Sequence, residues 1–261
     1  MGEGIISRRG GGGYITINFN LPAPPPTKSE DASLSQARTE LAATSVGNYA
    51  LFGGGGDGSV SNYYDTVDAY DTNLTRTTRT ALSQARRLLA ATSVGNYALF
   101  GGGDDGSGPS YSPVDAYDTN LSRTTTTELS QARDALAATS LGNYALFGGG
   151  QQFDISSTYS TVDAYDTNLS RTTPTALSQD RTFLSATNVG NYALFGGGRI
   201  GSTSFYNKVD VYTSPSYNVQ LFPETKYSFN GAAESTSSTW QTINVTGSLI
   251  GYMKIKSAQI N

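Results

Sequence analysis

LSQARRLLAATSVGNYALFGGG, residues 82–103, decides the fold, because the chain contains this stretch four times with few changes. Its first residue recurs every 47 or 48 residues, at Leu34, Leu82, Leu129 and Leu177. Self-similarity at such a period is typical of repeat architectures, in which each unit buries its apolar surface against its neighbours. We therefore expect an array of four similar units with shorter segments attached.

Each unit contains four segments with different apolar patterns. Residues 41–46 are small, as suits a strand at a crowded centre, and residues 48–55 (NYALFGGG) are apolar on both faces, as suits a sandwiched strand. Residues 66–71 are half apolar, and residues 74–80 are polar but rich in Thr, which suits an outer edge. This gradient predicts an all-β chain whose units are four-stranded blades of a β-propeller. A competing interpretation makes LSQARRLLAA a helix of a solenoid.

Segments outside the repeats predict three domains. Residues 1–30 hold a glycine-rich leader, a strand at residues 14–21 and a proline-rich linker, and residues 31–215 form the propeller. The leader lacks the apolar stretch of a secretion signal. It is either a flexible leader or an anchor peptide that becomes ordered by docking into a larger assembly. The expected anchor residues are Ile5, Ile6, Arg8 and Arg9.

The period stops after Thr213, and residues 216–261 are expected to form a small C-terminal β module. Its four short strands are predicted at residues 217–222, 226–229, 240–245 and 252–256. The first of them could instead complete the fourth blade. Alternatively, the whole segment is a fifth blade, and the N-terminal strand at residues 15–20 closes the ring.

Composition narrows the functional classes. A net charge of −4 and an isoelectric point near 4.8 argue against a nucleic-acid partner. Without Cys or His, the chain lacks a thiolate, the usual general base near neutral pH and the commonest transition-metal ligand. We therefore expect no enzyme activity, no cofactor and no metal, although Ca²⁺ at Asp57, Asp104 and Asp105 is an alternative. The repeated Asp68 and Asp71 are expected to cap turns.

The repeat resembles the kelch repeat over residues 34–213. The shared features are an Arg after a short loop (Arg38, Arg86, Arg133, Arg181), a strand ending in Gly-Gly, and V-D-x-Y-D at residues 67–71, 114–118 and 162–166. The fourth copy reads VDVYT at residues 209–213. Where kelch repeats carry Trp, this chain has Arg76, Arg123 and Arg171, and a guanidinium stacked on Tyr70, Tyr117 or Tyr165 is expected to replace part of that packing.

The amino-acid sequence of the repeat also resembles that of kelch-like proteins encoded beside phage tail genes. That resemblance implies a virion component, made in the host cytoplasm and attached to other virion structural proteins through the N-terminal peptide. A homo-oligomer without membrane insertion is expected.

The four copies differ from one another at two places. The segments after Gly-Gly-Gly read GDGSVSNYYD, DDGSGPSYSP, QQFDISSTYS and RIGSTSFYNK, from residues 56, 104, 151 and 199. A variable pair follows the repeated Arg: Thr39 and Glu40, Arg87 and Leu88, Asp134 and Ala135, Thr182 and Phe183. In an antiparallel blade, the loop between strands two and three lies at the end where strand one begins. Both variable sets are therefore expected on one face.

Tyr, Ser, Gly and Asp dominate these loops, a mixture that gives binding loops rigid aromatic contacts and adaptable hydrogen bonds. The predicted binding residues are Thr39, Glu40, Tyr63, Tyr64, Arg87, Leu88, Tyr111, Asp134, Phe153, Tyr159, Phe183, Phe205 and Tyr206. The alternative is drift, since loops tolerate change and turns favour the same residue types. Paired variation favours binding, because the start of a strand should drift less than a loop tip.

Three functions are compatible with these features. The first is a non-enzymatic phage virion protein, on the tail or the capsid, whose variable loops contact a host-surface glycan or protein. The second is a structural decoration or cement protein of the particle. The third is a cytosolic kelch-type adaptor for protein partners.

Overall fold

The computed structural model describes residues 32–59, 62–153 and 157–214, and the strands at residues 2–6, 15–19, 216–220 and 242–246. The chain divides into two compact units, Met1–Ser33 and Leu34–Asn261. All regular structure in the described residues is β, which confirms the predicted class and excludes the helix considered for LSQARRLLAA. None of the described residues forms a helix that could cross a bilayer.

In the first unit, β1 (Gly2–Ile6) pairs antiparallel with β2 (Ile15–Phe19), with Gly2 opposite Phe19. β2 matches the strand predicted at residues 14–21. β1 was not predicted, and it contains the anchor residues Ile5 and Ile6. Arg8, Arg9 and the proline-rich linker up to residue 31 lie outside the described residues.

Four antiparallel sheets, one for each repeat, make up the described core of the second unit. The first sheet contains β3 (Ala42–Val46), β4 (Tyr49–Gly53), β5 (Val67–Tyr70) and β6 (Arg76–Arg79). The second contains β7 (Ala90–Val94), β8 (Tyr97–Gly101), β9 (Val114–Tyr117) and β10 (Arg123–Thr126). The third contains β11 (Ala137–Leu141), β12 (Tyr144–Gly148), β13 (Val162–Tyr165) and β14 (Arg171–Thr172). These twelve strands confirm the predicted four-segment repeat.

The fourth sheet departs from the prediction of four strands. It consists of β15 (Ser185–Val189), β16 (Tyr192–Gly196) and β19 (Val209–Thr213), and no described strand pairs with the outer edge of β19. A short hairpin, β17 (Arg199–Ile200) and β18 (Ser204–Phe205), lies between β16 and β19 in the chain. The polar Thr-rich segment that supplies the outer strand in the other repeats is missing after Thr213, so this sheet ends one strand earlier.

Two strands follow the repeats. β20 (Ser216–Gln220) and β21 (Thr242–Thr246) pair with each other and not with β19. They match two of the four strands predicted in this segment. The strands predicted at residues 226–229 and 252–256 lie outside the described residues.

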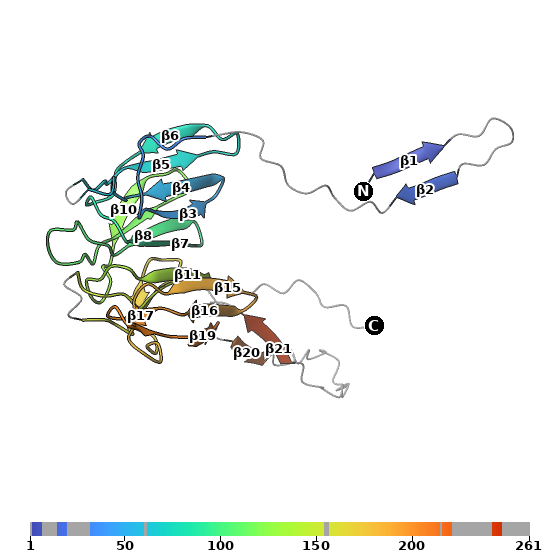
Figure 1. Ribbon diagram of the computed structural model, residues 1–261. Coiled ribbons are helices and arrows are strands. Elements are labelled where there is room, and N and C mark those ends of the chain that lie inside the picture. The colour runs from blue at the N-terminus through green and yellow to red at the C-terminus, as the bar shows by residue number, and fades with distance from the viewer. Residues whose placement is uncertain are drawn as a thin grey trace, which may run out of the picture. The chain divides into compact units, whose positions relative to one another are not determined.

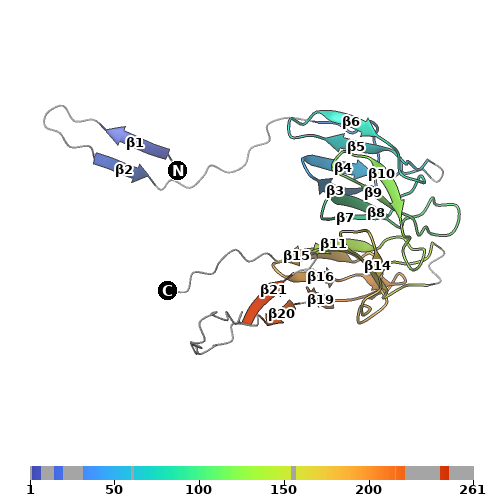
Figure 2. The same ribbon diagram turned by 180° about the vertical axis from the view of Figure 1, so that it is seen from behind.

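The sheets follow one another in chain order. The innermost strands β3, β7, β11 and β15 pack side by side in that sequence (Figures 1 and 2). Each sheet therefore has a leading face, toward the next repeat, and a trailing face, toward the previous one. In the YALFG strand, Tyr, Leu and Gly lie on the leading face, while Ala and Phe lie on the trailing face.

A phenylalanine and a glycine fit together at each seam between sheets. The ring of Phe100 lies against Gly53, so that a Cβ atom at Gly53 would be 2.9 Å from Phe100 Cε1. Phe147 meets Gly101, and Phe195 meets Gly148, in the same way. All three rings are fully buried. Glycine recurs here because any side chain would displace the ring that fills the seam.

A buried ion pair fastens the connecting segment to the sheet that follows it. Arg86 is fully buried, and its guanidinium donates to the Pro113 carbonyl at 3.0 Å, the Phe100 carbonyl at 3.1 Å and Asp115 Oδ2 at 2.8 Å. Ser83 N also donates to Asp115 Oδ2, at 2.9 Å. The same arrangement recurs around Asp68 and Asp163. These aspartates are ion-pair partners rather than the predicted turn caps.

The arginine of the outer strand adds to this network. Arg123 Nη1 donates to Asp115 Oδ1 at 2.8 Å, in place of the predicted stacking on Tyr117. The Tyr117 ring instead packs edge-on against Phe100, with centroids 5.9 Å apart, and its hydroxyl donates to the Thr80 carbonyl. The turn-capping role falls to residues such as Asp118, whose Oδ1 accepts the Asn120 and Ser122 N–H groups.

Candidate functional site

The residues that differ between the repeats lie together at one end of the sheets. In each repeat, a residue just before the innermost strand pairs with the residue just after the three glycines. The pairs are Thr39 with Gly56, Arg87 with Asp104, Asp134 with Gln151 and Thr182 with Arg199. Thr39 and Gly56 exchange both backbone hydrogen bonds, at 2.8 and 2.9 Å. The two variable segments thus adjoin, and we call the area they form the loop surface.

The second residue of each variable pair has a left-handed backbone. The φ angles are 58° at Glu40, 50° at Leu88, 47° at Ala135 and 52° at Phe183. Such angles are costly for residues other than glycine and persist where the surrounding structure imposes them. Here hydrogen bonds between repeats do so: Leu88 N donates to the Glu40 carbonyl, Ala135 N to Leu88 and Phe183 N to Ala135. The backbone is repeated while the side chain changes, so four different side chains are presented in the same way.

These four residues border a shallow cavity, open to solvent and about 260 Å³ in volume, that is lined by residues from every repeat. Its lining consists of Glu40, Leu41, Leu88, Leu89, Ala135, Leu136, Phe183 and Leu184. Four of these residues are leucines that occupy the same position in every copy, and they form an apolar wall: Leu41, Leu89, Leu136 and Leu184. The residue before each of these leucines differs from copy to copy, and is Glu40, Leu88, Ala135 or Phe183. The cavity therefore combines a constant wall with variable chemistry.

Arg87 connects the first and second repeats on the loop surface. Its guanidinium pairs with Glu40 Oε2 at 3.0 Å and Asp104 Oδ1 at 3.2 Å, and lies 5.2 Å from the centre of the Tyr63 ring. The Gly106 N–H also donates to Asp104 Oδ1. Burial raises the pKa of Asp104, while the Arg87 hydrogen bond opposes that shift. Asp104 thus positions the arginine within the protein, which leaves it poorly suited to the Ca²⁺ role considered from the sequence.

Asp134 occupies the equivalent place between the second and third repeats and is fully buried. Its Oδ2 accepts the Ser110 hydroxyl at 2.7 Å, and the Phe153 N–H donates to Ser110 Oγ at 2.8 Å. Its Oδ1 has no hydrogen-bond partner among the described residues. Burial raises the pKa of Asp134 to about 6. Asp134 therefore holds the loop that contains Phe153 in place through Ser110. This role is structural and does not require Asp134 to contact a ligand.

Four of the predicted binding tyrosines have a structural role that recurs in every repeat. Tyr64, Tyr111, Tyr159 and Tyr206 each donate their backbone N–H to the third glycine of the Gly-Gly-Gly segment. The hydroxyl of Tyr111 donates to Asp105 Oδ2 at 2.7 Å, and that of Tyr159 to Gln152 Oε1 at 3.3 Å. Burial and the Asp105 carboxylate raise the pKa of Tyr111 to about 12. The backbone bonds of all four tyrosines, and the hydroxyls of Tyr111 and Tyr159, hold the loops that carry the variable residues.

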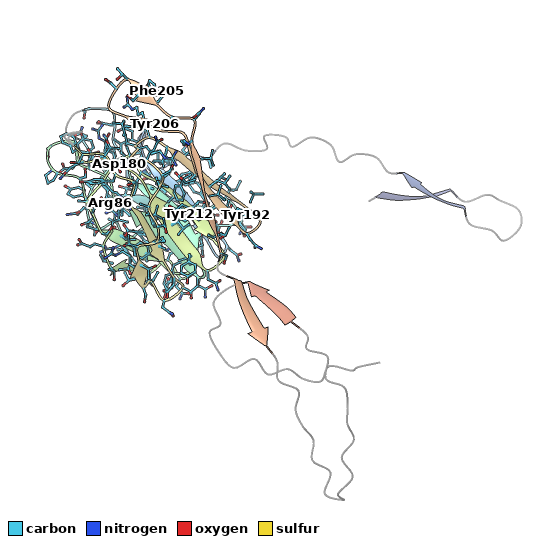
Figure 3. All side chains as sticks on the ribbon, turned by 90° about the horizontal axis from the view of Figure 1, so that it is seen from below. Arg86, Asp180, Tyr192, Phe205, Tyr206 and Tyr212 are labelled. Atoms are coloured by element: carbon cyan, nitrogen blue, oxygen red, sulfur yellow. The ribbon has the colours of Figure 1, made fainter. Side chains whose placement is uncertain are left out.

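The most accessible of the predicted aromatic residues belong to the fourth repeat. Phe183 is 46% exposed and Phe205 is 72% exposed, and the Arg199 guanidinium lies 4.6 Å from the centre of the Phe183 ring. Phe183, Gly198, Arg199 and Phe205 line a hollow of about 310 Å³. Figure 3 shows Phe205 and Tyr206 together at one end of the fourth repeat, away from Tyr192. Phe183 borders both this hollow and the cavity described above.

Two contributors to the loop surface were not predicted. The leucines that form the cavity wall were not predicted because they are identical in every copy, whereas the predicted residues came from segments that differ between copies. Arg199 lies in a predicted binding loop, but only the aromatic residues of these loops were predicted as contacts. The cation–aromatic contact with Phe183 depends on tertiary pairing of Arg199 with Thr182.

Within residues 32–59, 62–153 and 157–214, no three acidic residues lie close enough together to hold a metal ion. No protein-family model matches the chain, and no curated protein matches it in sequence. The likeness to kelch repeats therefore depends on the repeated residues quoted above.

Proposed function

We propose that this chain is a non-enzymatic binding protein of a phage virion, built from kelch-like β-propeller blades. In this proposal the N-terminal peptide attaches it to other structural proteins of the tail or capsid, and the loop surface contacts a glycan or protein on the host. The observation that carries the proposal is the gathering of the variable residues at one end of an otherwise repeated scaffold.

The chemistry of the loop surface supports recognition rather than catalysis. A cavity of about 260 Å³ and a hollow of about 310 Å³ adjoin at Phe183. Apolar pockets with a few oriented polar groups are typical ligand sites. Arg87 and Arg199 are both held over aromatic rings, so their donors are directed before a ligand arrives. Aromatic and arginine side chains are enriched among the residues that form the centre of protein interfaces.

The binding proposal predicts that Phe183→Asn together with Phe205→Ser weakens adsorption of particles to host cells by about tenfold or more, which corresponds to about 1.4 kcal/mol. Both rings are exposed, so the fold should persist. The measurement is the adsorption rate of particles that carry the variant chain, with the melting temperature of the purified protein as a check on folding.

Asn120→Ser is the control. Asn120 is exposed and lies in the turn between β9 and β10, at the opposite end from the loop surface. Adsorption should be unchanged in this variant. If the double variant adsorbs as well as the wild type, the loop surface is not the host contact. A particle map with the loops buried against other subunits would favour the decoration role instead.

A further inference from the structure

Among the described repeat sheets, the first and the last each expose a face of the kind that forms a seam elsewhere in the array. On the leading face of the fourth sheet, Val189 is 64% exposed and Val209 is 54% exposed. The matching residues of the first sheet, Val46 and Val67, are 4% and 0% exposed because the second sheet covers them. The described residues contain no fifth sheet of this type that could cover the fourth in the same way.

The opposite face is open at the other end of the array. Ala50 is exposed and Phe52 is partly exposed on the trailing face of the first sheet. Their counterparts in the other three sheets are fully buried: Ala98 and Phe100, Ala145 and Phe147, Ala193 and Phe195. β15 does not pack on β3 in the way that β3, β7 and β11 pack on their successors. The chain therefore does not close its own array with the described sheets.

These two open faces carry the two halves of one repeated seam. At the three internal seams, a phenylalanine ring fills the space over a glycine of the preceding sheet. Gly196 is the fourth such glycine, and a Cβ atom there would meet only Val209 Cγ2, at 3.5 Å. Phe52 is the fourth such phenylalanine, and among the described repeat sheets none precedes it. The first sheet thus offers an unused ring, and the fourth sheet offers an unused place for one.

The hydrogen-bond chain between the repeats ends at the same two sheets. It runs from Phe183 to Ala135 to Leu88 to Glu40, each N–H donating to the next carbonyl. Among the described residues, the Phe183 carbonyl and the Glu40 N–H are its unused ends. One further bond of the same kind, from Glu40 N to a Phe183 carbonyl, would continue the series across a junction between two copies.

Side-chain changes in the fourth repeat keep its open face apolar. Val211 stands where the first three repeats have Ala69, Ala116 and Ala164, and it is 54% exposed, although Ser185 replaces an alanine at the inner edge of the same face. A face adapted to water would not be expected to gain methyl groups. Large exposed apolar patches on soluble proteins typically mark interaction surfaces.

We infer that a second copy of this chain covers both open faces, with the fourth sheet of each copy packed on the first sheet of the other. Two such junctions, related by a two-fold axis, close a ring of eight sheets. Closed rings of four to eight blades are the usual range for propellers, so two copies complete a ring and three would exceed that range. The new junctions are continuous with three seams that the chain already forms.

The test is the mass of the full-length protein in solution, by light scattering after gel filtration. The wild type should have twice the chain mass of 27.5 kDa. Phe52→Asp removes the ring from one face and Gly196→Val blocks its place on the other, so each variant alone should be monomeric. A side chain at position 196 should be tolerated in the single chain, because the added Cβ atom would meet only Val209 Cγ2, at 3.5 Å. Gly108→Val, where no atom lies within 4 Å, is the control and should remain a dimer.

Mixing the two variants tests the head-to-tail arrangement. Phe52→Asp retains its Gly196 face, and Gly196→Val retains its Phe52 face, so the mixture should form a heterodimer with one intact junction. A symmetric contact of either face with itself would not produce this rescue. A monomeric wild type, with its own terminal segments covering the ends, would overturn the inference, as would a dimer that survives both substitutions.

Discussion

Single side chains in this protein fall into those that repeat and those that vary, and the two kinds differ in their chemistry. The repeated Arg86 and Asp115 form a buried ion pair in which the charges satisfy each other. The variable Asp134 is just as buried, but it accepts a neutral hydroxyl and leaves one oxygen without a partner among the described residues. Burial disfavours the charged form of this carboxylate, and this explains the raised pKa of Asp134. Folding stability should therefore depend on pH at this residue.

Asp134→Asn tests that dependence. The folded-state pKa of about 6 exceeds the ordinary value of 3.8, so the folded chain retains this proton longer than the unfolded chain does. The associated stability is present below about pH 4 and is lost as the pH rises through about 6. Relative to the wild type, the variant should gain on the order of 2 kcal/mol between pH 4.5 and pH 7, measured by urea unfolding at both pH values.

Asp57→Asn is the control for the sign of this effect. Hydrogen bonds from Ser59 and Asn62 lower the pKa of Asp57, so it is ionised in both folded and unfolded chains above about pH 4.5. Its stability relative to the wild type should not change between the two pH values. If Asp134→Asn behaves like Asp57→Asn, Asp134 is ionised in the folded protein.

The strands of each sheet are short. Buried charged side chains therefore help to hold the strands, and the segments that connect the sheets, in place. The segment before the second sheet contains neither helix nor strand, and Ser83 and Arg86 attach it to Asp115 of β9. β10 attaches to the same carboxylate from the other side through Arg123. One aspartate therefore holds an irregular segment and an outer strand on a central strand.

Comparing Arg86→Met with Arg123→Met separates the two attachments. Arg86→Met removes the fully buried partner of Asp115 and should destabilise the protein by roughly 3 to 5 kcal/mol. The Arg123 side chain is 25% exposed, and Arg123→Met should cost about 1 kcal/mol or less. Chemical denaturation of both variants provides the measurement. Equal losses would show that the irregular segment contributes no more than the outer strand does.

At the scale of the whole molecule, identical stretches of sequence have different surroundings because they occupy different places in the array. YALFG occurs in all four repeats, yet Leu99 in the second is fully buried while Leu194 in the fourth is only partly buried. No local property of the strand explains this difference. It arises because Leu99 lies beneath the third sheet, whereas no described repeat sheet follows the fourth.

Leu99→Ala and Leu194→Ala should therefore differ in stability. Leu99→Ala removes a buried side chain at an internal seam and should cost about 2 to 5 kcal/mol, while Leu194→Ala should cost less than about 2 kcal/mol. Both changes are to be made in the Phe52→Asp background, so that Leu194 remains at a free end. Equal costs in urea unfolding would mean that something covers the fourth sheet within the single chain.

The amino-acid sequence by itself determined the repeat and its strands. The period of 47 or 48 residues and the alternation in NYALFGGG predicted the first three strands of all four repeats to within one or two residues. It also placed both variable segments at one end, because antiparallel geometry leaves a single choice. The same comparison could not reveal that Tyr64 and its counterparts hold the loops through backbone hydrogen bonds, since an aromatic residue that contacts a ligand and one that holds a loop look alike in a sequence.

Only the tertiary structure decided what surrounds each copy. Near-identical repeats cannot encode which neighbour is absent, so the open faces at Phe52 and Gly196 became visible only when the sheets were placed side by side. The raised pKa of Asp134 likewise depends on contacts between residues that are distant in the chain. The repeat can be recognised from the order of residues along the chain, whereas the burial of each copy is set by the neighbours that packing brings together.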